Sequence, residues 1–199
     1  MMNGREMRSL LPFIISSFIV HHLVKFVWAS LPGYDPSMKT INDALVYGIK
    51  SSKDMVDALT ADLKGSEWNQ RAVPDSNCPA WLIGHLILTD RRALALAGVT
   101  DLPELPAGFE ARFGREGGAP QAAGFGEASI LMPLFDKQRD LLMNAIATLP
   151  ASQFDQPLPK PHPRFKTLGE FFLFMGAHVM MHAGQISTVR RSLGRPPLF

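Results

Sequence analysis

Four stretches of apolar residues, spaced three and four positions apart, constrain the fold of this chain more than any other feature of its sequence. This spacing places the apolar side chains on one side of an α-helix. No stretch alternates apolar and polar residues in the way that a half-buried strand does. The pattern therefore predicts an all-α chain folded as a four-helix bundle. The predicted helices are residues 40–64, 79–97, 129–149 and 167–192.

The ends of these segments carry helix-boundary signals. Pro79 suits the first position of the second helix, which makes Cys78 its expected N-cap. Thr167 and Glu170 form a T-x-x-E capping box at the start of the fourth helix. Pro133 is expected in the first turn of the third helix, where a proline is tolerated. Glycines that stop a helix follow the first, second and fourth segments: Gly65, Gly98 and Gly194.

Two predicted connections, residues 98–128 and 150–166, are too long for a simple up-and-down bundle. Long loops in compact domains are commonly functional. The second connection has prolines at alternate positions, which favours a stiff connector over a polyproline docking segment. These prolines are Pro157, Pro159, Pro161 and Pro163.

Residues 1–37 differ from the rest of the chain. Two arginines precede an apolar stretch at residues 10–20, a pattern typical of a secretory signal peptide. Two histidines and a lysine then follow, where a signal peptide has apolar or small residues. The uninterrupted apolar part is shorter than the ~20 residues that span a bilayer.

We therefore divide the chain into a hydrophobic N-terminal appendage, residues 1–37, and a helical domain, residues 38–199. The favoured interpretation of the appendage is an extension or a mis-set start, which predicts a cytoplasmic protein. A signal peptide, a membrane anchor formed by residues 10–31, or a helix packed on the domain stay open as alternatives. Export or membrane contact is expected only if residues 10–31 are genuine and retained.

The composition excludes several classes of site. The single cysteine, Cys78, allows no intrachain disulfide, cysteine zinc cluster or iron–sulfur centre. A net charge of +2 gives no case for nucleic-acid binding. A di-iron carboxylate bundle needs glutamates on all four helices. The only glutamate firmly inside a predicted helix is Glu170, at the cap. Phosphate-binding and nucleophile-elbow motifs are also missing from the sequence.

His178 and His182 carry the clearest chemical signal. Four residues apart on a helix, they lie about 40° from each other around its axis and can bind one metal ion. The motif is not that of zincin proteases, because Val179 stands where those enzymes have a glutamate. Two histidines at this spacing can also be polar core residues. A third ligand must come from another helix, and His85 on the second helix is the candidate.

The W-x-x-G-H-L motif at residues 81–86 and the H-x-x-x-H-x-G-Q-I motif at residues 178–186 resemble the DinB/YfiT-like superfamily. The resemblance covers about residues 39–195. It implies a four-helix bundle, often a homodimer, with a divalent metal ion, most commonly zinc or nickel. It also implies metal-dependent hydrolysis, or S-transfer and isomerisation with a low-molecular-weight thiol. The metal ligands that it implies are His85, His178 and His182.

Three neutral nitrogen ligands leave a metal ion positively charged, with an open position for water or a thiol. Next to these ligands, Asp90 is a candidate for moving a proton, and Gln185 can orient a ligand or hydrogen-bond a histidine ring. Trp81 can line the pocket. Helix packing is the alternative for Gln185, and core packing for Trp81.

Two functions therefore stay open. The first is a metal-dependent enzyme acting on a small-molecule substrate, either a hydrolase or a thiol-dependent transferase. The alternative is a non-catalytic metal- or ligand-binding helical bundle.

The remaining reactive or charged residues have less specific interpretations. Cys78, at a helix N-terminus, can have a lowered pKa, but a capping or packing role suffices. His162, in the proline-rich connection, is expected to be solvated, and His21 and His22 receive no role. Three arginines near the end of the fourth helix suit the helix dipole better than an anion site. They are Arg190, Arg191 and Arg195.

Overall fold

The computed structural model describes residues 39–114, 124–125 and 128–198, and the chain from Thr40 onward forms one compact unit. It is all-α, as predicted, and the described residues hold no strand beyond one isolated bridge between Pro157 and Thr167. The four long helices are α2 (Ile41–Thr60), α3 (Pro79–Leu96), α5 (Ala128–Thr148) and α6 (Leu168–Ser192). The shorter ones are α4 (Phe109–Phe113) and two 3-10 helices, η1 (Gly65–Asn69) and η2 (Ala151–Gln153).

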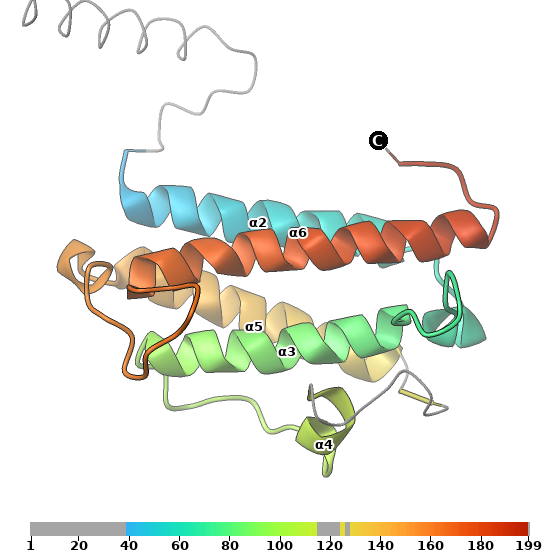
Figure 1. Ribbon diagram of the computed structural model, residues 1–199, viewed down its shortest axis with the longest axis horizontal. Helices are drawn as coiled ribbons and strands as arrows, with labels where there is room; N and C mark the ends of the chain where they lie inside the picture. Colours follow the sequence, from blue (N-terminus) through green and yellow to red (C-terminus); the bar gives the residue numbers. More distant parts are fainter. Residues whose placement is uncertain (1–38, 115–123, 126–127, 199) are drawn as a thin grey trace, which may run out of the picture. The chain divides into compact units, whose positions relative to one another are not determined.

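The four long helices pack in a ring (Figure 1). Helix α2 packs against α5 and α6, and α3 packs against the same two helices, so α2 and α3 are diagonally opposite. Helices α2 and α6 run in one direction, and α3 and α5 run in the other. The chain must therefore travel back along the bundle between α3 and α5, and it must cross diagonally between α5 and α6. This topology explains the long connections that the sequence predicted.

Three of the four predicted helices match the observed bounds closely, but the first is shorter than expected. Helix α2 ends at Thr60, and the 3-10 helix η1 begins at Gly65, which has a φ of +47°. Leu63 keeps the apolar spacing of the helix because it lies in the core, 7% exposed. Its carbonyl oxygen accepts a hydrogen bond from the indole of Trp68 at 3.2 Å. The helix was therefore predicted too long, because the apolar spacing continues after the helix has ended.

The helix caps follow local sequence. Thr40 and Asp43 form a capping box at the start of α2, a signal that the sequence analysis did not use. At α6, the Thr167 hydroxyl accepts a hydrogen bond from the Glu170 amide at 3.2 Å, as predicted. The Glu170 carboxylate accepts instead from the amide of Lys166, so only half of the expected capping box forms.

Two further expectations need correction. Pro133 lies inside α5, beyond its first turn, because the helix begins at Ala128. Helix α4 interrupts the connection that was expected to be a loop, and it buries Phe109 and Phe113, whose ring centres are 4.4 Å apart. Their i, i+4 spacing was the available signal.

Helix α4 contacts α3 at Gly84, next to His85. A Cβ added at Gly84 would lie 2.2 Å from the Phe113 ring, so a glycine is required for this approach. In α6, which packs against α2, a Cβ added at Gly176 would lie 3.1 Å from the backbone of Gly48. Close helix contacts therefore hold both helices that carry the motif histidines.

None of the described helices combines the length and apolar character needed to cross a bilayer. The appendage at residues 1–37, with its apolar stretch at residues 10–31, lies outside the described part of the chain. Its role and the domain boundary at residue 38 stay predictions.

Candidate metal centre

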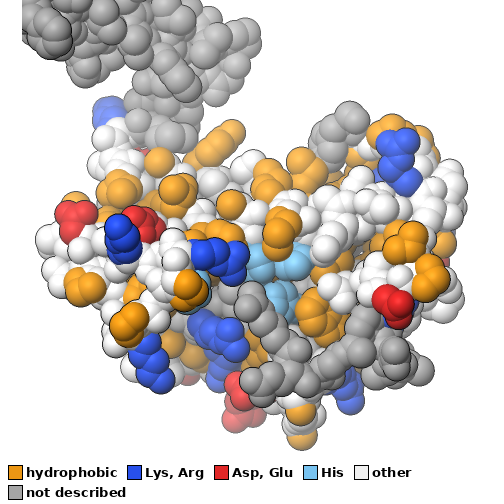
Figure 2. Space-filling model, in the orientation of Figure 1, with side chains coloured by type: hydrophobic (Ala, Val, Ile, Leu, Met, Phe, Trp, Pro, Cys, Tyr) orange, Lys and Arg blue, Asp and Glu red, His pale blue; other side chains and the backbone are white. Residues whose placement is uncertain are grey.

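Three histidines from two neighbouring helices converge on one point. His85 comes from α3, and His178 and His182 come from α6. One potential ligand atom from each lies within 4.8 Å of the other two, and no other such group of three occurs among the described residues. The exposed fractions are 9%, 6% and 6% in that order. Histidine side chains reach the surface near the middle of the face shown in Figure 2.

Aromatic side chains hold two of these rings in place. Trp81 stacks on His85 with ring centres 5.0 Å apart and an angle of 5° between the planes. Phe174 stacks on His178 at 5.1 Å and 22°. Each aromatic residue lies four positions before its histidine, so the helix itself sets the pairing. Trp81 therefore contacts the site as well as the core. The stacking of Phe174 on His178 was not predicted from the sequence.

Gln185 sets the tautomer of His182. The His182 Nδ1 lies 2.7 Å from Gln185 Oε1, which accepts its proton. The lone pair of His182 then lies on Nε2, 3.0 Å from His178 Nε2. Burial lowers the pKa of His182, although the hydrogen bond to Gln185 opposes the shift. The neutral ring, which is the metal-binding form, is therefore favoured.

The donor set fits a divalent transition metal ion. Two nitrogens bound to one zinc ion at about 2.0–2.1 Å lie about 3.3 Å apart at a tetrahedral angle. The 3.0 Å between the Nε2 atoms of His178 and His182 is close to that value. Three imidazoles suit zinc and nickel alike, and they leave coordination positions for other ligands.

Comparison with known protein families gives an independent result. The model of the DinB superfamily matches residues 49–186, more than half of the chain. The chain belongs to the DinB superfamily. The matched region contains all three histidines and Gln185. No curated protein matches the chain significantly.

In this DinB-superfamily chain, Asp90 does not contact the histidines. It is buried on the side of α3 that faces α5, where its Oδ1 lies 3.0 Å from Nη1 of Arg139. Arg139 also donates to the backbone oxygen of Ile49 and to the hydroxyl of Ser52, at 2.9 and 2.6 Å. Burial raises the pKa of Asp90, and the neighbouring guanidinium opposes that rise. Asp90 therefore forms an ion pair in the core and not the expected contact next to a metal ligand, because the five-residue spacing places it on another face of α3 than His85.

Cys78 occupies the N-cap position of α3, as predicted, but its side chain makes no capping hydrogen bond. It is 1% exposed, and burial raises the pKa of its thiol. The lowered pKa considered from sequence is therefore wrong, because desolvation outweighs the helix N-terminus.

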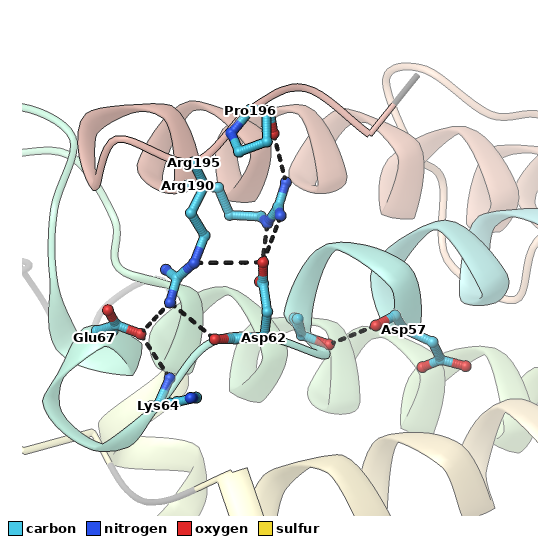
Figure 3. Close-up of polar contacts among 8 residues, drawn as sticks. Asp57, Asp62, Lys64, Glu67, Arg190, Arg195 and Pro196 are labelled. Carbon is cyan, nitrogen blue, oxygen red and sulfur yellow. Dashed lines mark hydrogen bonds and ion pairs between the residues drawn. The ribbon is translucent and has the colours of Figure 1, made fainter.

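Two of the C-terminal arginines form ion pairs (Figure 3). Arg190 donates to both carboxylate oxygens of Asp62, at 3.1 and 2.7 Å. Arg195 binds Glu67 at 2.7 Å and the backbone oxygen of Asp62 at 2.8 Å. These hydrogen bonds lower the pKa of both acidic side chains. The arginines therefore fasten the end of α6 to the turn after α2. Arg191 is exposed.

Proposed function

We propose that this chain is a metal-dependent enzyme in which His85, His178 and His182 hold a divalent metal ion, zinc or nickel. The observation that supports this most is the convergence of three imidazoles from α3 and α6, with Gln185 accepting the Nδ1 proton of His182. A hydrogen-bonded partner on the far nitrogen is typical of metal-ligating histidines because it fixes the tautomer and the ring orientation.

A metal ion held by His85, His178 and His182 would supply Lewis acidity, which would lower the pKa of a bound water or thiol. The chain contributes the geometry. Trp81 and Phe174 restrict the rings of His85 and His178, and burial keeps His182 neutral. A rigid three-nitrogen set leaves coordination positions open for a small-molecule substrate, and histidine side chains reach the surface in Figure 2.

Activation of a small thiol is the reaction class that we favour. A thiol bound to a metal ion held by these histidines would release its proton to solvent water and would need no protein base. Hydrolysis is faster when a protein group moves the proton. Asp90, the sequence candidate for this task, is instead ion-paired with Arg139. Gln185 has no proton to exchange at neutral pH. Hydrolysis is the second candidate, and its general base would be a residue other than Asp90 and Gln185.

Elemental analysis of the full chain tests the metal centre first. We expect about one metal ion per chain, lost in His178→Ala and in His182→Ala. Arg191→Ala is the control, because Arg191 is an exposed residue of the same helix, α6, outside the cluster. A wild-type chain that binds no metal and gains no stability on metal addition would overturn the proposal.

Turnover separates the reaction classes. We expect conjugation of an aryl halide with a small thiol to depend on the metal and on His182. Metal-dependent cleavage of esters or amides without thiol activity would favour the hydrolase. A stable metal site with neither activity would support a binding bundle instead.

A further inference from the structure

Arg164 lies beside the metal centre in the loop that precedes α6. Its guanidinium carbon is 5.5 Å from the centre of the Phe174 ring and 5.7 Å from that of Phe165. The Phe174 ring in turn stacks on His178 at 5.1 Å. The guanidinium carbon is therefore at most 10.6 Å from the centre of the His178 ring, the sum of the two distances through Phe174.

The loop holds this arginine in position. Phe165 packs against Phe174 and Phe171, with ring centres 4.7 and 5.7 Å apart. His162 stacks on Phe165, with ring centres 4.7 Å apart, and accepts a hydrogen bond from the Arg164 amide at 3.2 Å. A guanidinium is attracted to the faces of aromatic rings, and its planar fork of N–H donors can bind both oxygens of a carboxylate. These contacts therefore keep the guanidinium of Arg164 near the Phe174 ring that stacks on His178.

Arg164 is exposed and forms no ion pair with any residue that the structure describes, and the same holds for Arg92. Arg92 lies two turns after His85 on nearly the same side of α3. Because α3 and α6 are antiparallel, Arg92 lies toward the end of α6 that carries Phe174 (Figure 1). Figure 2 shows Lys and Arg side chains directly beside the histidines.

We infer that Arg164, supported by Arg92, recognises a carboxylate on the molecule that binds at the three histidines. This inference rests on the proposed function and narrows its substrate class. The ligand is a small bifunctional molecule with a sulfur at one end and a carboxylate several bonds away. Arginine suits this task because its planar fork binds both carboxylate oxygens.

Thiol binding to the cobalt-loaded full chain tests this directly. Sulfur bound to cobalt gives a charge-transfer absorption, so affinity is measured without turnover. The probes are ω-mercapto acids from 3-mercaptopropionate to 6-mercaptohexanoate and their neutral amides. We expect wild type to prefer the acid over its amide by about threefold to tenfold at the best chain length, the range for a partly exposed charged hydrogen bond.

Variants test whether Arg164 causes the preference for the acid over the amide. Arg164→Gln should abolish it while leaving amide binding within about twofold of wild type, because only the charged contact is lost. Arg164→Lys should retain part of it, since the charge stays and the fork is lost. Arg191→Gln is the control, because Arg191 is an exposed arginine at the far end of α6.

Each other outcome has a distinct meaning. Equal binding of acids and amides by wild type, or an unchanged preference in Arg164→Gln, overturns the role of Arg164 and leaves the proposed function intact. Cobalt binding without a thiol band overturns thiol activation, and failure to bind cobalt overturns the metal centre. Either of these two results would also overturn carboxylate recognition by Arg164.

Discussion

Replacing Gly84 with alanine tests how the loop around α4 supports the metal centre. The added Cβ would lie 2.2 to 2.4 Å from three atoms of the Phe113 ring. That ring is 1% exposed and packs between Phe109 and Phe125, with ring centres 4.4 and 6.0 Å away. Because neighbours enclose it, the ring cannot move without disturbing the core. Such overpacking costs about 1–3 kcal/mol.

A matched substitution isolates this cost from helix propensity. Alanine stabilises a helix interior by about 1 kcal/mol relative to glycine. Gly184 in α6 has nothing within 4 Å of an added Cβ, so Gly184→Ala should show that gain alone. We therefore expect Gly84→Ala to be less stable than Gly184→Ala by about 1–3 kcal/mol. Urea unfolding of both variants, followed by circular dichroism, measures the difference in free energy of unfolding.

A double-mutant cycle identifies the contact. In a Phe113→Ala background the ring is gone, so Gly84→Ala should stabilise the chain as Gly184→Ala does. Because His85 follows Gly84 directly, the single variant should also bind metal more weakly. Equal stability of the Gly84→Ala and Gly184→Ala variants, within about 0.5 kcal/mol, would refute the packing argument.

Three further predictions follow from the polar and reactive groups. Arg139→Met leaves Asp90 buried without its partner and should destabilise the chain by about 3–5 kcal/mol in urea unfolding, with metal content per folded chain unchanged. Gln185→Leu should weaken metal binding by about 10- to 100-fold in a chelator competition, and a variant that binds metal as tightly as wild type would contradict its role. Cys78 should react with iodoacetamide only after unfolding. Since burial raises its folded pKa, the neutral thiol is the folded form. Stability should therefore fall as pH rises above about 8.5, where the unfolded thiol ionises, and Cys78→Ala should lose that dependence.

Short-range features of this protein follow from the sequence alone. Helix positions, the cap at Thr167 and the stop at Gly194 depend on residues within one or two turns. The pairing of His178 with His182 is equally local, because the helix sets their separation. The motif resemblance added His85, and the match to the DinB superfamily supports that family.

Only the tertiary structure decided which surfaces meet. The packing of α3 beside α6 brings His85 to the pair on α6, and the packing of α5 against α3 gives Asp90 its ion-pair partner, Arg139. Burial reverses the pKa shift considered for Cys78. Arg164 reaches Phe174 through a loop that folds back on α6, a contact that no local pattern indicates. The physical reason is common to all four: desolvation, ion pairing and ring stacking depend on neighbours that are distant in the sequence, whereas periodicity describes one helix at a time.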